Sequence, residues 1–226
     1  LSEAGCLTNE TIFSLTELPR RLAVIGAGPI GCELAQSFQR FGSEVTLVEQ
    51  ICQILPREDR EAAQTVEHQF ERDGIKTLCE AKIERIEKRG EERVLHLERH
   101  GEKVELIVDQ ILIGVGRAPN VEGLGLEGTG VEVDRTHIVT NEWTETGEPG
   151  VYAVGDVAGF PSLASTGMKQ GHHAAAHAFG EAVKSFPRFS PYGIYTIPEI
   201  LVVGKNEIEL TEAGTPYEIG KEIGRA

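Results

Sequence analysis

Three glycines near the start of the chain have the spacing of a loop that binds the diphosphate of a nucleotide. Gly26, Gly28 and Gly31 follow the apolar run 21–25 and lead into a segment with helical periodicity. In such a loop the first glycine makes a tight turn, the second admits a diphosphate, and the third lets the helix pack on the strand. The diphosphate lies at the helix N-terminus, against free N–H groups and the positive end of the helix dipole. The pattern therefore predicts a dinucleotide-binding site.

An acidic residue after the next apolar run supports this prediction. Glu49 follows the run 45–48 and comes after Gly31 at about the separation, ~20 residues, at which a carboxylate binds the ribose of NAD. A carboxylate there repels a 2′-phosphate, and no Lys or Arg lies between Glu49 and Leu55 to offset that repulsion. We therefore expect NAD, and expect NADP less. The predicted contacts at the loop also include Ala27, Pro29 and Ile30.

The elements expected around these residues form a nucleotide-binding βαβαβ unit. Apolar runs alternate with amphipathic helical segments, with strands at 21–25, 45–48 and 75–78 and helices at 29–41 and 56–72. From 81 to 108 the pattern changes to apolar and polar alternation, which predicts a small antiparallel meander. A buried strand over 109–113 follows and stops at glycines. The fold class expected is α/β, with a Rossmann-like parallel sheet and an antiparallel meander in the crossover.

The second half of the chain repeats the ending of a strand at a glycine. The run 151–156 is expected to be a strand that ends at Gly155 and Asp156, and an alanine-rich helix is expected at 168–181. Asp156 could accept hydrogen bonds from a ligand hydroxyl or could only cap the loop that follows. Beyond a proline-containing linker, the remaining elements expected are short strands at 194–197 and 200–203 and a helix at 206–213.

The composition excludes several classes of function. The 22 basic and 36 acidic residues give a net charge of −14, which opposes binding to nucleic acids or anionic membranes. No apolar run is long enough for a membrane helix, and the first residues lack the features of a signal peptide. The four cysteines have no CxxC or CxxxxC spacing, so we expect separate reduced thiols in a cytoplasmic protein.

A possible metal site is the alternative that the second half offers. His173, His177 and Glu181 fall on one face of the expected helix and could supply three metal ligands. The solvent face of a surface helix gives the same pattern, and an exposed triad lacks the supporting contacts that metal sites need. We therefore predict no metal.

Taken in order, three segments resemble the pyridine nucleotide-disulfide oxidoreductases. They are 26–33 with Glu49, 113–120 and 151–156. Within that family, 9–49 is similar to mercuric-reductase-type proteins, while 193–200 and 216–220 are similar to soluble transhydrogenases; dihydrolipoamide dehydrogenases also belong to it. The resemblance implies a connecting segment at 1–18, an NAD(P) domain at 19–140, a returning part of an FAD domain at 141–186, and the start of a dimerisation domain at 187–226.

The resemblance also implies roles for individual residues. Asp156 beside Gly155 would bind FAD, and Glu33 would contact the nicotinamide side or only favour the helix N-terminus. Gly116 and Arg117 would line the cofactor crevice or only order their loop. Hydride would pass between nicotinamide and flavin in a homodimeric enzyme.

The same resemblance leads us to expect a fragment. The chain contains no second glycine-rich segment for FAD, no CxxxxC pair, and no His and Glu pair of the interface domain. We predict no catalytic residue and no activity for the chain alone. The alternative is a non-catalytic NAD-binding module or truncated product that needs a partner chain for FAD.

Overall fold

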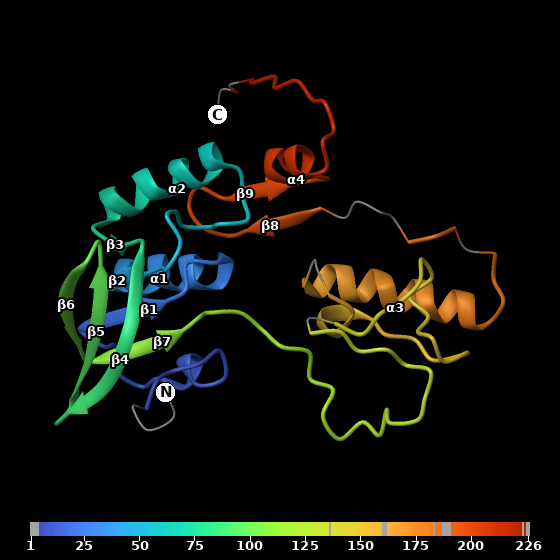
Figure 1. Ribbon diagram of the computed structural model, residues 1–226, viewed down its shortest axis with the longest axis horizontal. Helices are drawn as coiled ribbons and strands as arrows, with labels where there is room; N and C mark the ends of the chain where they lie inside the picture. The colour runs from blue at the N-terminus through green and yellow to red at the C-terminus, as the bar shows by residue number, and fades with distance from the viewer. Residues whose placement is uncertain are drawn as a thin grey trace. The chain divides into compact units, whose positions relative to one another are not determined.

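The computed structural model describes residues 5–135, 137–159, 162–182, 184–186, 191–222 and 224 (Figure 1). The chain forms two compact units. The first comprises the described residues of Leu1–Gly116, Gly193–Ile200 and Lys205–Ala226, and the second those of Arg117–Tyr192 and Leu201–Gly204. Among the described residues, no helix has both the length and the apolarity needed to cross a bilayer.

A four-stranded parallel sheet forms the centre of the first unit. Its strands are β1 (Arg21–Ile25), β2 (Glu44–Val48), β3 (Lys76–Leu78) and β7 (Gln110–Ile113), in the order β3-β2-β1-β7. The last residue of β1, Ile25, pairs with Val48 on one side and with Ile113 on the other. The chain order reverses between β1 and β7, and in open parallel sheets ligands bind beyond the carboxyl ends of strands at such a point.

The central strand β1 is apolar throughout because both of its faces are covered. Leu22 and Val24 pack in one core cluster with α1 (Pro29–Phe41) and α2 (Arg60–Asp73). Ala23 and Ile25 pack in the other with the antiparallel meander, whose strands are β4 (Ala81–Arg89), β5 (Glu92–Arg99) and β6 (Glu102–Val108). The predicted fold class, with its meander in the crossover to β7, is therefore confirmed.

The two helices of this unit differ in how well their starts were predicted. Helix α1 spans the predicted residues and ends at Gly42, whose φ of 110° is left-handed. Helix α2 begins at Arg60, later than the predicted start at residue 56. Leu55 has a φ of 47° and Asp59, the N-cap, has a non-helical ψ of 139°, so the helix cannot begin before Arg60. A short 3-10 helix, η2 (Ile12–Ser14), precedes β1.

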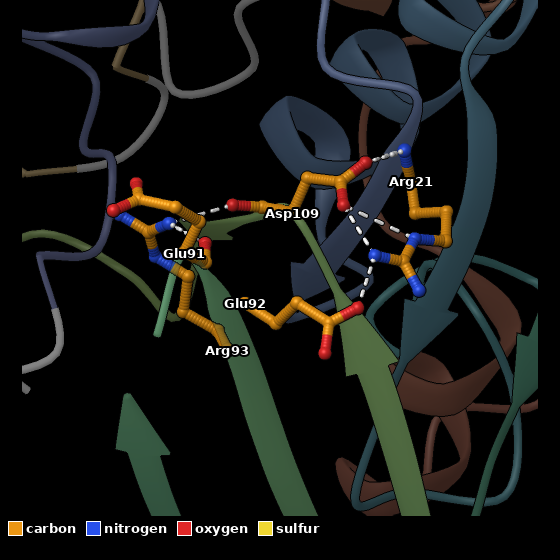
Figure 2. Close-up of polar contacts among 5 residues, drawn as sticks. All are labelled: Arg21, Glu91, Glu92, Arg93 and Asp109. Atoms are coloured by element: carbon orange, nitrogen blue, oxygen red, sulfur yellow. Dashed lines mark hydrogen bonds and ion pairs between the residues drawn. The ribbon is translucent and has the colours of Figure 1, made fainter. Parts of the chain in front are cut away.

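An arginine at the start of β1 is bonded to Glu92, at the start of β5, and to Asp109, which immediately precedes β7 (Figure 2). The Arg21 Nε donates to Asp109 Oδ1 at 3.1 Å, its Nη2 contacts the same oxygen, and Nη2 also donates to Glu92 Oε1 at 2.8 Å. The backbone N–H of Arg21 donates to Asp109 Oδ2 at 2.8 Å. On the far side, Arg93 Nη1 donates to the carbonyl oxygens of Asp109 and Glu91 at 2.9 and 2.7 Å. The network lies at the strand starts, away from the carboxyl ends.

We expect Asp109→Asn to cost about 1 kcal/mol of stability at pH 7, because the side chains of Arg21 and Asp109 are still about one third exposed. The hydrogen bond from Arg21 lowers the pKa of Asp109 in the folded state. The carboxylate therefore stabilises the fold above its unfolded pKa, ~3.9, and this contribution is lost as the pH falls through the folded pKa. Urea unfolding at pH 7 and pH 3 measures both values.

The difference between wild type and Asp109→Asn should thus shrink at pH 3. Glu84→Gln is a matched control, since Glu84 pairs with Lys103 at 3.6 Å through more exposed side chains, and it should change stability little at either pH. An Asp109→Asn protein as stable as wild type at pH 7 would show that the network contributes nothing.

The second unit contains little regular structure among its described residues. It has a 3-10 helix η3 (Gly155–Ala158) and helix α3 (Ala164–Ala178). The strand predicted at 151–156 is wrong. Only Tyr152 forms a β-bridge there, with Glu145, and the φ of 76° at Gly155 turns the chain into η3. Helix α3 begins and ends earlier than the predicted 168–181, because Leu163 is an extended N-cap and Gly180 has a φ of 75°.

The last elements are shorter than predicted, and the strand predicted at 194–197 is wrong except at Ile194, because the chain bends from Thr196 on. Strands β8 (Tyr192–Ile194) and β9 (Ile200–Val202) form a two-stranded sheet, and α4 (Glu207–Glu212) follows. Asn206 begins α4 with a capping box, since its side chain accepts from the Glu209 N–H at 2.9 Å and Glu209 Oε2 accepts from its N–H at 3.1 Å. Part of the linker predicted at 185–191, residues 187–190, lies outside the described residues.

Candidate dinucleotide-binding site

Two of the three glycines are required by the packing of the loop itself. Gly26 has a φ of 96°, and a Cβ on it would lie 2.6 Å from the carbonyl oxygen of Gly114 at the end of β7. A Cβ on Gly31 would lie 1.9 Å from the carbonyl oxygen of Gly26. The first glycine thus allows β1 and β7 to end side by side, and the third allows α1 to start against β1.

Gly28 is different, because the fold alone does not require a glycine there. Its φ is −71°, its conformation is extended, and a Cβ would meet nothing within 4 Å. It is the N-cap of α1 and provides no side-chain cap. The backbone N–H groups of the first helical turn have no intrahelical partner. Gly28 therefore leaves open space at the positive end of a helix, which is the feature that an approaching diphosphate needs.

Residues that follow β2 hold Ala27, the middle residue of this loop. Its N–H donates to Glu49 Oε2 at 2.8 Å, and its carbonyl oxygen accepts from the Leu55 N–H at 2.7 Å and from Cys32 Sγ at 3.3 Å. Leu55 was not among the predicted contacts of this loop. It is buried and has a φ of 47°, and no motif in the sequence indicates that conformation.

Glu49 lies beside the glycine loop. Besides the Ala27 N–H, its carboxylate accepts the N–H groups of Gln50 and Ile51 at 2.6 and 3.1 Å through Oε1. These three bonds fix the carboxylate, which is half-buried. An ionised carboxylate offers about four acceptor positions, and its three bonds to described residues leave one for a ligand hydroxyl.

The remaining loop residues have mixed surroundings. Pro29 and Ile30 are exposed in the first turn of α1. Glu33 accepts the backbone N–H of Tyr195 at 2.7 Å through Oε1, a contact that neither of its two predicted roles anticipated. Tyr195 follows Glu33 by 162 positions, and no sequence pattern relates the two.

The cysteines are free thiols, as expected. Burial raises the pKa of the Cys32 thiol far above its usual value, and it raises that of Cys79 to about 11. Both side chains therefore remain protonated at neutral pH, and Cys32 acts as a weak donor to the glycine loop.

In the second unit, the predicted residues Arg117 and Asp156 are paired. Arg117 Nη1 and Asp156 Oδ2 lie 2.5 Å apart, and both side chains are about half exposed. The neighbouring Gly155 donates its N–H to Gln170 Oε1 at 2.8 Å. Gly116, the last residue of the first unit, has a φ of 121°. The sequence had suggested Arg117 and Asp156 separately and had not related them to each other.

The histidines of the alternative metal site have aromatic surroundings. His177 stacks on Trp143 with ring centroids 5.6 Å apart, and its Nδ1 lies 2.7 Å from the hydroxyl oxygen of Tyr152. His173 has an edge contact with Phe186. The expectation of a solvent-facing triad is therefore wrong for both histidines. Throughout the described ranges, no group of three His, Cys, Asp or Glu residues is placed to hold a metal ion.

Comparison with known proteins relates this geometry to a family. Residues 4–178 match the family model described as pyridine nucleotide-disulphide oxidoreductase. The chain is 44% identical to a dihydrolipoyl dehydrogenase of Thermus scotoductus over 90% of the chain and 45% of the relative. It is 42% identical to a soluble pyridine nucleotide transhydrogenase of Pseudomonas putida over 94% of the chain and 46% of the relative. The chain spans about half the length of the curated relatives it matches.

Solved structures show the same relationship. The copper(II) complex of the HOCl-induced flavoprotein disulfide reductase RclA from Escherichia coli superimposes with a TM-score of 0.83 at 30% identity, covering 93% of this chain and 49% of that one. LpdA from Mycobacterium tuberculosis superimposes with a TM-score of 0.82 at 30% identity, covering 92% and 45%. The chain belongs to the pyridine nucleotide-disulphide oxidoreductase family.

Proposed function

We propose that this chain is the NAD(H)-binding portion of an FAD-dependent oxidoreductase that passes hydride between nicotinamide and flavin. The observation that carries the proposal is the open space at Gly28. The fold does not require a glycine at this position, but a diphosphate that approaches the backbone there does. The cofactors supply the hydride chemistry when they are bound. The residues of this chain bind and orient the dinucleotide through the glycine loop and the N-terminus of α1.

A preference for NAD over NADP is part of the proposal. The Glu49 carboxylate is held beside the glycine loop by three backbone N–H groups. Its free acceptor position suits a ribose hydroxyl, whereas a 2′-phosphate would place two anions in contact. None of residues 50–55 is a Lys or Arg that could compensate.

For the complete enzyme we propose an FAD site to which this chain contributes Gly155 and Asp156. The carboxylate of Asp156 suits a flavin-side hydroxyl, and its pairing with Arg117 gives it a fixed partner. We also propose residues 19–140 as the NAD domain, although the compact units divide after Gly116, so that residues 117–140 belong to the second unit. The complete enzyme is proposed to be a homodimer, as the family resemblance implies, and to be cytoplasmic, which the four free thiols support.

Calorimetric titration of the purified 226-residue chain with NADH and NADPH tests the proposal. We expect NADH to bind and NADPH to bind more weakly. If neither nucleotide binds, the loop is only a strand-to-helix turn. Flavin absorbance of the purified chain separates the two candidate descriptions, since bound flavin would show that the chain holds FAD without a partner.

Replacing Glu49 with Ala should weaken NADH binding by about 1–3 kcal/mol, which is roughly 5- to 150-fold in Kd. The change removes both the ribose acceptor and the bond that holds Ala27, while it removes the repulsion of NADPH. The ratio of NADPH to NADH affinity should therefore rise, as measured by calorimetry.

Glu44→Ala is the matched control for this change. Glu44 is an acidic residue at the opposite end of β2, where it pairs with Lys76 at 2.5 Å on the exposed surface. Its loss should leave the affinity for both nucleotides unchanged. An unaltered nucleotide preference in Glu49→Ala would reassign Glu49 to a purely structural role.

A further inference from the structure

Two side chains of α1 hold the short segment 195–197, which follows β8, against the helix. Gln36 is buried, and its amide pairs with the backbone of Ile197. Its Oε1 accepts the Ile197 N–H at 2.7 Å, and its Nε2 donates to the Ile197 carbonyl oxygen at 2.8 Å. Nearer the N-terminus of α1, Glu33 accepts the N–H of Tyr195 at 2.7 Å. Three hydrogen bonds from two side chains of α1 therefore hold the backbone of this segment.

The orientation of the Gln36 amide is fixed by a carboxylate on its other side. Gln36 Nε2 also donates to Asp73 Oδ2 at 2.9 Å, and Asp73 accepts from Arg40 Nε at 2.9 Å and from Gln69 Nε2 at 2.8 Å. Burial opposes ionisation of Asp73, but these hydrogen bonds outweigh it and lower its pKa. A flipped amide would direct its oxygen at the carboxylate. Gln36 is therefore set in the one orientation that pairs with Ile197.

The segment is also anchored by its neighbours. Ile194, which precedes it, is fully buried in the core cluster that includes α1. Thr196 is buried as well, and its Oγ1 donates to the Pro198 carbonyl oxygen at 2.8 Å. The Tyr195 N–H is consequently presented to Glu33 by a backbone that Ile194 holds on one side and Gln36 holds on the other.

The contact between Glu33 and Tyr195 matters because of where Glu33 lies. It occupies the second turn of α1, whose first turn begins after Gly28. An unanchored carboxylate in the second turn, close to the helix N-terminus, can turn toward a bound diphosphate and repel it. The hydrogen bond from Tyr195 holds the carboxylate on the segment. Binding of an anionic dinucleotide is therefore easier when residues 195–197 are docked.

We propose that Gln36 is a positioning residue for the dinucleotide site. Gln36 holds Ile197, so that the Tyr195 N–H stays bonded to Glu33. Docking of residues 195–197 is thereby coupled to occupation of the glycine loop. This inference rests on the proposed function. By linkage, the coupling is reciprocal: a dinucleotide that binds better to the docked form stabilises that form.

Amide hydrogen exchange at Tyr195 and Ile197, followed by NMR with and without NADH, tests the coupling in the 226-residue chain. NADH should slow exchange at both amides. Gln36→Leu should speed exchange at Ile197 and also at Tyr195, whose own partner is unchanged, and should weaken NADH binding about three- to tenfold. Calorimetry of the same samples measures the affinity.

Gln39→Leu is the matched control, because Gln39 is another glutamine of α1 whose Oε1 accepts a backbone N–H, that of Val45 at 2.9 Å. This variant loses a side chain–backbone bond but none to residues 195–197. The exchange rates of the Tyr195 and Ile197 amides and the NADH affinity should therefore stay unchanged. The exchange of wild type with and without NADH tests the coupling even if Gln36→Leu does not fold. NADH binding without added protection at Tyr195 and Ile197 would overturn this inference alone. Absence of NADH binding would overturn the proposed function together with it.

Discussion

Replacement of Gly28 by alanine is expected to weaken NADH binding about ten- to hundredfold while leaving the fold at least as stable as wild type. The new methyl group would meet nothing within 4 Å in the protein, and the φ of −71° at this position suits alanine. Gly to Ala changes at compatible positions stabilise by about 0.4–1 kcal/mol through the unfolded state. A diphosphate pressed against the backbone would instead meet the methyl group, and such overpacking costs about 1–3 kcal/mol.

Calorimetry with NADH and urea unfolding measure the two effects separately. Gly171→Ala is a suitable control, because Gly171 lies inside α3 and a Cβ there also meets nothing within 4 Å. It should raise the stability slightly and leave NADH binding unchanged. Undiminished NADH affinity in Gly28→Ala would mean that the dinucleotide does not approach the backbone at this residue.

Much of the first unit could be predicted because its signals are local. The apolar runs of β1 and β2 are buried on both faces, and α1 is bounded by Pro29 and by Gly42, whose left-handed conformation ends the helix. The glycine spacing reflects one local constraint and one contact with the neighbouring strand. Gly31 avoids a clash with the backbone of Gly26, and Gly26 avoids a clash with the backbone of Gly114 at the end of β7. Glu49 contacts the glycine loop because it follows β2, whose end must lie beside the end of β1.

Other features depend on contacts that leave no pattern in the sequence. Gln36 and Ile197 are 161 positions apart and meet through a side chain and a backbone, so the identity of Ile197 carries no signal. Arg117 and Asp156 are likewise 39 positions apart. The strand predicted at 151–156 failed for another reason. An apolar run predicts burial, but a strand also needs a partner along its length, and here only Tyr152 forms a bridge.

Gly31→Ala should lower the stability of the fold, whereas Gly28→Ala should not, although the two glycines are close in the same loop. A Cβ at Gly31 would lie 1.9 Å from the carbonyl oxygen of Gly26 and 3.1 Å from its carbonyl carbon. These are backbone atoms at the end of β1, where the Gly26 N–H is bonded to the Val48 carbonyl oxygen at 2.9 Å. Relieving the overlap must move α1 away from the sheet or displace that end of β1.

We expect Gly31→Ala to lower the free energy of unfolding by about 3 kcal/mol or more, at the upper end of what overpacking costs. For a chain of this size that corresponds to a fall in Tm of roughly 6–12 °C. Thermal unfolding followed by circular dichroism measures it, with Gly28→Ala as the control within the same loop. Because the strand end and the helix start move apart, NADH binding should fall as well, but only together with stability. A Gly31→Ala chain with the Tm of wild type would show that α1 does not pack against Gly26 as closely as described, and the loop would then lose the rigidity on which the dinucleotide site depends.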